Sequence, residues 1–137
     1  MPLPVLVDTN VLLDISTNDE RWFEWSASAL EQAGDESTLV INPIIYAEVS
    51  IAYKRIEDLE LALPPATFRR ETLPYEAAFL AGKAFLKYRQ RGGRGKLRPL
   101  PDFYIGAHAA VSGYRLLTRD AARYRTYFPG LDVIAPD

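Results

Sequence analysis

The 137-residue sequence predicts an α/β fold in which a central, mostly parallel β-sheet is flanked by helices on both faces. Two short β-branched runs, residues 5–7 and 38–41, have the composition of strands buried on both faces. Longer stretches with apolar residues at helical spacing separate such runs, as expected when helices join parallel strands. Neither a linker nor an internal repeat interrupts the chain, so we expect a single domain over residues 1–137.

The composition is that of an ordinary globular protein, with 48% hydrophobic and 25% charged residues. The absence of cysteine excludes disulfides, zinc–thiolate sites and thiol catalysis. No apolar stretch approaches the roughly 18 residues that span a membrane, and the pattern of a secretory signal is absent. We therefore expect a soluble, cytoplasmic protein that makes no membrane contact.

The first strand is followed directly by an acid, Asp8. A buried charge at this position is costly unless another group pairs with it. Asp8 or Asn10 could cap the short helix that contains residues 11–13. This stretch alone therefore does not decide between a helix cap and a functional site.

The next expected elements are a helix that starts near residues 18–20 and ends at Gly34, the strand at 38–41, and a helix from Ile44 to about Lys54. One apolar stripe of this last helix contains Ile44, Ile45, Ile51 and Ala52. Glu48 lies at the centre of that stripe, so a solvated surface position fits it poorly. A buried salt bridge and a site role are the alternatives, and the cost of buried pairs favours the site.

The second half of the chain continues the alternation. We expect helices over residues 56–63, 74–92, 102–113 and 121–127, strands over 114–118 and 131–134, and an irregular or weakly extended connection over 68–73. Asp102 opens one of these helices and by itself is more typical of an N-cap, whereas Asp120 lies where a strand ends and a helix begins. The single histidine, His108, lies away from Asp102 on the helical wheel and is interpreted as structural.

The carboxyl ends of parallel strands meet at one edge of a sheet, and Asp8 and Asp120 both fall there. Glu48 and Asp102 can reach the same crevice. Four crowded carboxylates raise one another's pKa values unless a cation neutralises them. Oxygen ligands without cysteine or paired histidines favour Mg²⁺ or Mn²⁺, which can activate water and stabilise a phosphodiester transition state.

A net charge of −2 conceals a basic block, because no acid lies between Glu76 and Asp102. This interval carries seven positive charges, at Lys83, Lys87, Arg89, Arg91, Arg94, Lys96 and Arg98. Nearby glycines predict a flexible basic loop over residues 89–98 that follows a phosphate backbone, although a merely solvated loop is the alternative. The predicted RNA-binding residues are Arg89, Arg91, Arg94, Lys96 and Arg98.

The ordered set of motifs resembles PIN-domain ribonucleases, specifically VapC-type toxins of bacterial or archaeal toxin–antitoxin pairs. The matching segments are Val-Leu-Val-Asp-Thr-Asn-Val-Leu at 5–12, Glu48, Asp102 with Phe-Tyr-Ile-Gly-Ala-His-Ala at 103–109, and Leu-Thr-Arg-Asp at 117–120. These segments span nearly the whole chain. Residues 57–74 contain no motif that matches the family.

This resemblance implies a metal site with two supporting polar groups. The implied ligands are Asp8, Glu48, Asp102 and Asp120, with Asn10 and Thr118 beside them. The resemblance also implies Mg²⁺- or Mn²⁺-dependent endonucleolytic cleavage of RNA, a homodimer, and inhibition by a cognate VapB-like antitoxin that covers or enters the site.

Two other functions compete with this one. A degenerate domain of the same fold would bind RNA or a partner without cutting, but its usual sign is the loss of acids, and all four are present. A haloacid-dehalogenase-like phosphatase needs an acid two residues after the first Asp, where this chain has Asn10. The preference for RNA over DNA rests on the resemblance alone, because metal-dependent phosphodiester cleavage does not itself require the 2′-hydroxyl.

Overall fold

The computed structural model describes residues 2–92 and 100–136. Its strands form one five-stranded sheet in the order β3-β2-β1-β4-β5, and every neighbouring pair is parallel. The strands are β1 (Val5–Val7), β2 (Leu39–Ile41), β3 (Phe68–Arg70), β4 (Arg115–Leu117) and β5 (Val133–Ile134). The predicted α/β class is confirmed, with a sheet that is entirely parallel in the part of the chain described.

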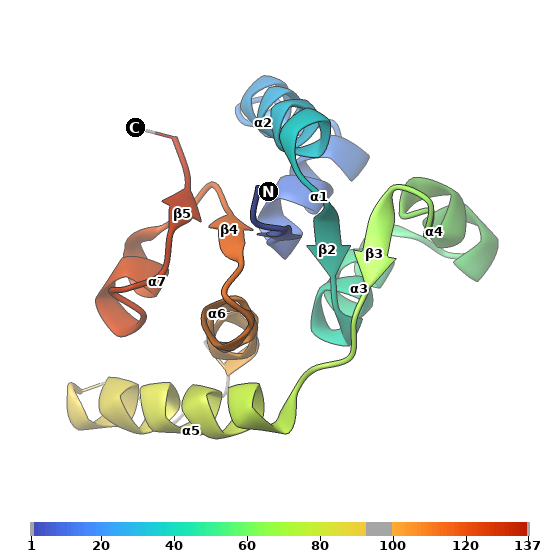
Figure 1. Cartoon of the computed structure of the whole chain (residues 1–137). Coiled ribbons are helices and arrows are strands. Elements are labelled where there is room, and N and C mark those ends of the chain that lie inside the picture. The colour runs from blue at the N-terminus through green and yellow to red at the C-terminus, as the bar shows by residue number, and fades with distance from the viewer. Residues whose placement is uncertain (1, 93–99, 137) are drawn as a thin grey trace.

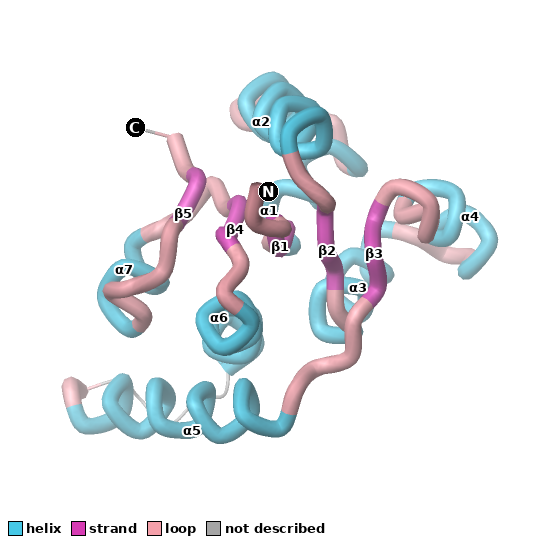
Figure 2. Tube along the Cα trace, in the orientation of Figure 1, coloured by secondary structure: helices cyan, strands magenta, loops and turns pink. Residues whose placement is uncertain are grey.

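Helices cover both faces of this sheet, as predicted. They are α1 (Thr9–Ser16), α2 (Phe23–Glu36), α3 (Pro43–Val49), α4 (Ile56–Ala62), α5 (Tyr75–Gln90), α6 (Leu100–Ser112) and α7 (Ala122–Tyr127). Figure 1 shows α2 on one side of the sheet and α5 and α6 on the other. The same view coloured by secondary structure shows the short strands gathered between the helices (Figure 2). Among the described helices, none is long and apolar enough to cross a membrane.

The central strand β1 explains why the site can be built at this sheet. Each of its three residues is at most 1% exposed, because β2 and β4 pair with its two edges and helices cover its faces. The Val-Leu-Val run suits this environment, since a strand buried on both faces needs apolar side chains in both directions. Asp8, which follows β1 directly, is therefore carried by a fully buried strand that is paired on both edges.

The connection expected at residues 68–73 contains a strand instead. Phe68–Arg70 pairs with β2 along its whole length and forms the edge of the sheet. Only Phe68 is buried, whereas Arg69 and Arg70 are exposed. Two arginines in three residues obscure the strand pattern, but an edge strand tolerates them because one side of it faces solvent.

The helix expected from Ile44 to Lys54 is shorter than predicted. It ends at Val49 and continues as a 3₁₀ turn over Ser50–Ala52, where the Ser50 hydroxyl donates to the Ala47 carbonyl. Ile51 is consequently 85% exposed, so the predicted apolar stripe is wrong beyond Val49. A Ser hydroxyl bonded to the preceding turn competes with regular helix and accounts for the early end.

Helix α2 also departs from its predicted bounds, since it begins at Phe23 and continues past Gly34 to Glu36. A Cβ added at Gly34 would lie 3.3 Å from Leu39 Cδ1. Gly34 therefore permits close packing between α2 and β2 and does not end the helix.

His108 is fully buried in a hydrogen-bonded network away from the acids. Asn42 Oδ1 accepts from the Ile45 backbone nitrogen, so its amide nitrogen faces His108 Nδ1 at 3.0 Å and donates to it. The ring proton consequently lies on Nε2, which donates to Glu71 Oε1 at 3.3 Å. Burial lowers the pKa of His108, which agrees with the structural interpretation of this residue.

Candidate active site

A cleft of about 340 Å³ opens at the carboxyl ends of β1 and β4. All four predicted acids line it, although they come from four separate segments of the chain: Asp8, Glu48, Asp102 and Asp120. The remaining lining residues are Thr9, Asn10, Leu13, Ala122, Arg123 and Tyr124. The topology thus brings together acids that are up to 112 positions apart (120 − 8) in the sequence.

Asp8 is 3% exposed and has two roles. Its Oδ1 caps α1 by accepting from the Thr9 backbone nitrogen at 2.7 Å. Its Oδ2 accepts from the hydroxyls of Thr118 at 2.8 Å and Tyr124 at 2.9 Å. Burial raises the pKa of Asp8 to about 6, against the lowering effect of these hydrogen bonds, and the charge of Asp102 raises it further. The same carboxylate therefore caps α1 and lines the cleft.

The Thr118 hydroxyl joins three of the predicted residues. It accepts from Asn10 Nδ2 at 3.1 Å and from the Asp120 backbone nitrogen at 3.2 Å, and it donates to Asp8 Oδ2. One hydrogen and two lone pairs are all that a hydroxyl offers, so Thr118 is fully used. Asn10 Oδ1 in turn accepts from the Arg119 backbone nitrogen at 3.2 Å. The two residues predicted to be supporting groups thus connect the end of β4 to Asp8.

Glu48 lies on α3 and is hydrogen-bonded to Thr9, the residue that follows Asp8. Its Oε1 accepts from the Thr9 hydroxyl at 2.7 Å. Burial raises the pKa of Glu48, with a smaller contribution from the charge of Asp102. Within residues 2–92 and 100–136, no salt bridge involves Glu48. The alternative of a buried salt bridge therefore finds no support there.

Asp102 is not the N-cap that its sequence position suggested. It lies inside the first turn of α6, which begins at Leu100. Its Oδ2 accepts from Arg123 Nη1 at 2.8 Å. Burial raises the pKa of Asp102 and Arg123 opposes that rise, while the charge of Asp120 adds to it. Asp120 is exposed at the rim of the cleft, immediately after β4.

The donor set suits a hard divalent cation, because it consists of carboxylates without a histidine. Excess negative charge is evident in the way Asp102 raises the pKa values of Asp8 and Glu48. In the described chain, however, no three acidic or histidine side chains are gathered at ion-binding spacing. Arg123 neutralises Asp102 instead. Coordination by all four acids therefore requires side-chain movement that brings them closer together.

Sequence reasoning missed three polar residues of the cleft: Thr9, Arg123 and Tyr124. Burial raises the pKa of Tyr124 well above its usual range, with the Asp8 charge adding to it, so its hydroxyl stays a donor. Residues 123 and 124 lie about one helical turn after Asp120, and this spacing is the one signal that pointed to them. Thr9 is adjacent to Asp8 but reads as an ordinary first residue of a helix.

The predicted basic loop is described only in part. Arg89 and Arg91 are exposed at the end of α5, and the Arg91 guanidinium lies over the Tyr127 ring, 5.7 Å from its centroid. The other three predicted RNA-binding residues lie outside the described residues: Arg94, Lys96 and Arg98.

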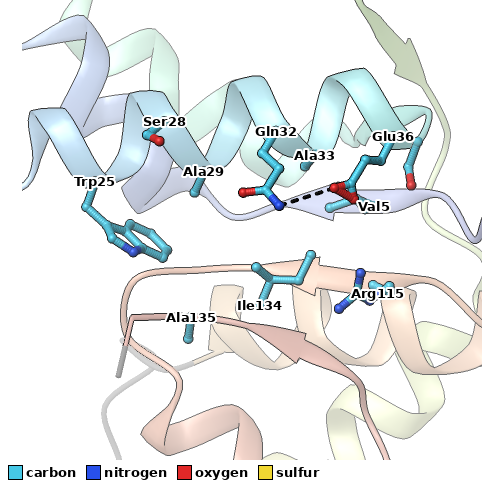
Figure 3. Close-up of a pocket in the computed structure, with 11 residues that line it drawn as sticks. Val5, Trp25, Ser28, Ala29, Gln32, Ala33, Glu36, Arg115, Ile134 and Ala135 are labelled. Atoms are coloured by element: carbon cyan, nitrogen blue, oxygen red, sulfur yellow. Dashed lines mark hydrogen bonds between the residues drawn. The ribbon is translucent and has the colours of Figure 1, made fainter.

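A second cavity, of about 290 Å³, contains none of the predicted site residues. Figure 3 shows it between α2 and the segments that carry Arg115 and Ile134. Its polar side chains have local partners, because Gln32 donates to Glu36 at 3.2 Å and Arg115 pairs with Asp132 at 2.9 Å. These contacts indicate that the polar side chains of this cavity have structural roles.

The family model for the PIN domain matches residues 5–129 of this chain. VapBC2 from Rickettsia felis, bound to a DNA fragment from its promoter, has a similar fold, with a TM-score of 0.74 at 18% identity over 98% of this chain and 100% of that one. A toxin–antitoxin complex from Klebsiella pneumoniae gives a TM-score of 0.68 at 25% identity, over 97% and 98% of the two chains. VapBC-1 from nontypeable Haemophilus influenzae gives 0.71 at 18% identity, again over 97% and 98%. No match was found among curated proteins.

Proposed function

This chain belongs to the PIN-domain family, and from that premise we propose that it is a Mg²⁺- or Mn²⁺-dependent endoribonuclease, the toxin of a VapBC-type toxin–antitoxin pair. One observation carries the proposal: four carboxylates from four segments line one cleft at the carboxyl ends of adjacent parallel strands. That arrangement suits hydrolysis of a phosphodiester bond by a metal-activated water.

The ion would be held by Asp8, Glu48, Asp102 and Asp120. When bound, it supplies positive charge to a phosphodiester transition state and lowers the pKa of water to give a nucleophile near neutral pH. The chain itself orients the carboxylates, since Thr118 and Tyr124 hold Asp8. The Thr9 hydroxyl orients Glu48 in the same way. Such hydrogen bonds to ligand carboxylates are typical of functional metal sites.

A nucleic acid is the proposed substrate because a basic flank adjoins the acidic cleft. Arg89 and Arg91 end the helix that packs along α6, which carries Asp102. Cationic side chains there attract a polyanion, while the acids act on a single phosphodiester. The choice of RNA over DNA follows the VapC resemblance.

A VapB-like antitoxin is the proposed protein partner, and a homodimer is the proposed assembly. The similar structures from Rickettsia felis and Haemophilus influenzae are named as VapBC, which supports the antitoxin. A toxin that acts on cellular RNA is expected in the cytoplasm.

The direct test is RNA cleavage by the purified chain, with Mg²⁺, with Mn²⁺ and with chelator. We expect cleavage only with metal, and we expect Asp8→Asn and Asp120→Asn to abolish it without loss of the fold. Asp35→Asn is the matched control, because Asp35 is an exposed acid on α2, outside the cleft. Full activity of Asp8→Asn, or activity in chelator, would contradict the proposal.

A second candidate function is RNA or partner binding without cleavage. The Asp102–Arg123 salt bridge favours it, since that contact satisfies an acid without any metal. The same assay separates the two functions, because a binding domain would retain RNA but leave it intact under every metal condition. A metal-dependent phosphatase would instead hydrolyse phosphate monoesters and spare internal RNA bonds.

A further inference from the structure

Two aromatic rings beside the cleft lie next to each other, with an arginine at each end of the pair. The Arg123 guanidinium lies over the Tyr88 ring, 5.9 Å from its centroid. The Tyr88 ring meets the Tyr127 ring edge-on at 6.3 Å, and the Arg91 guanidinium lies over Tyr127 at 5.7 Å. We call this row, Arg123–Tyr88–Tyr127–Arg91, the Arg–Tyr ladder. It leads from the wall of the acidic cleft to the end of α5.

We propose that the Arg–Tyr ladder is a binding track for single-stranded RNA that enters the acidic cleft. This inference rests on the proposed ribonuclease function and adds the route by which the strand reaches the acids. Tyr88, Tyr127 and Arg123 were not among the residues expected from the sequence to bind RNA. Arg123 lines the cleft, and Tyr88 and Tyr127 follow it in the row of contacts, which points to the strand's path.

Arg123 is suited to contact the phosphate nearest the acids. It is the one cationic residue among those that line the cleft in the described chain. A guanidinium carries five N–H donors in a planar fork, and the contact with Asp102 engages Nη1. A phosphate that enters the cleft can therefore meet the other donors, and Asp102 is relieved of its partner when Arg123 turns to the phosphate.

Tyr88 and Tyr127 have the support that stacking platforms need. Each ring is partly buried and meets the fully buried Phe103 ring edge-on, at 5.8 Å and 5.1 Å. These contacts hold the two rings in place, and the Phe85 ring also stacks on Tyr88 at 6.2 Å. A base that stacks on either ring takes the place of the guanidinium that lies over it. Bases of a single strand stack on such aromatic rings and on arginine planes, and every base can do so because each has a π-face.

The charge around the ladder favours a polyanion along its whole length. Neither residues 77–92 of the α5 segment nor residues 121–131 of the α7 segment contain an acid. The acid that contacts the ladder is Asp102, at the cleft itself. A strand is therefore attracted along the ladder until its backbone reaches the carboxylates. Rings that stack require unpaired bases, so the ladder selects single strands over duplexes.

Binding of a fluorescein-labelled twelve-nucleotide oligouridylate, followed by anisotropy in chelator, tests this track without any cleavage. Tyr88→Leu and Tyr127→Leu keep an apolar contact with Phe103 but remove the ring, and each should weaken binding at least about fivefold. Arg123→Gln and Arg91→Gln should each make the slope of log affinity against log salt shallower by about 0.7.

The matched control is another cation–aromatic pair on the same helix. Lys83 lies over the Phe79 ring at 5.1 Å, and Phe79 is 70% exposed on the side of α5 opposite Tyr88. Phe79→Leu and Lys83→Gln should leave the binding of the oligonucleotide within about twofold of the unaltered chain. Tyr88→Phe retains the ring and should also bind normally, which separates stacking from any loss of folding.

Three results would overturn the proposed binding track. The first is that the unaltered chain fails to bind the oligouridylate, and the second is that the tyrosine variants bind it no worse than Phe79→Leu does. The third is that the tyrosine substitutions weaken the binding of an RNA duplex as much as that of the single strand. Failure of the ribonuclease proposal gives a different result. If the chain binds the single strand through the ladder but never cleaves it with Mg²⁺ or Mn²⁺, the binding track is supported and the ribonuclease activity is refuted.

Discussion

Replacing Asp8 by asparagine should stabilise the metal-free protein at neutral pH. The pKa of Asp8 is raised from 3.8 to about 6, so the folded chain holds this proton more tightly than the unfolded chain does. The resulting cost is absent below pH 3.8, grows as the pH rises, and is complete above about pH 6. A difference of about two pKa units corresponds to about 3 kcal/mol. Solvent screens this cost very little, since Asp8 is only 3% exposed.

Asparagine removes the charge but fits the hydrogen-bonding groups less well. Its amide nitrogen would face either the Thr9 backbone nitrogen or the hydroxyls of Thr118 and Tyr124, which costs about 1 kcal/mol for each hydrogen bond lost. That loss is the same at every pH. The quantity to compare is therefore the stability of Asp8→Asn minus that of the unaltered chain, which should rise by about 2.5 kcal/mol between pH 4 and pH 7.5.

Urea unfolding in chelator, followed by tryptophan fluorescence, measures this difference. Asp35→Asn serves as the control, because it removes an exposed charge outside the cleft and should show no such rise. Adding Mn²⁺ at 100 times its dissociation constant should stabilise the unaltered chain by about 2.7 kcal/mol and Asp8→Asn far less. If the stability difference between Asp8→Asn and the unaltered chain does not change with pH, Asp8 does not carry a destabilising buried charge in the metal-free protein.

Three further substitutions test the packing and hydrogen bonds behind the cleft. Gly106→Ala should lower the free energy of unfolding by about 1–3 kcal/mol, because its Cβ would lie 2.6 Å from Phe128 Cε2 and 3.0 Å from Tyr124 Cδ1; equal stability in urea would contradict this. Tyr124→Phe should keep the fold and raise the pKa of Asp8, since the lost hydroxyl donates to it; the pH–stability profile should then shift upward in pH. Thr118→Val should shift that profile in the same direction and also reduce cleavage, and an unchanged profile would show that the Thr118 contact does not orient Asp8.

Local sequence patterns were sufficient to place Asp8 and Asp120 at one edge of the sheet. A Val-Leu-Val run is buried on both faces wherever parallel strands pair on either side of it, so the residue after it must emerge at the carboxyl end. Asp120 follows β4 for the same reason. The convergence of Asp8 with Asp120 thus follows from strand order alone, because β1 and β4 are neighbours.

Sequence periodicity could not predict which side chains of different helices contact one another. The salt bridge from Arg123 to Asp102 joins α7 to α6, and nothing in either helix alone indicates it. Tyr124 reaches Asp8 only because Gly106 lets α7 approach α6 closely. The edge strand was likewise hidden, since its two arginines resemble a polar connection. These features depend on tertiary packing, which a single sequence does not encode in a short pattern.

We propose that the four acids of the cleft hold a divalent cation. Anomalous scattering from crystals soaked in Mn²⁺ tests it most directly. We predict a manganese peak between the carboxylates of the cleft, with Arg123 turned away from Asp102 to release it. Manganese bound elsewhere on the chain, with Asp102 still paired to Arg123 and RNA cleavage intact, would contradict the account.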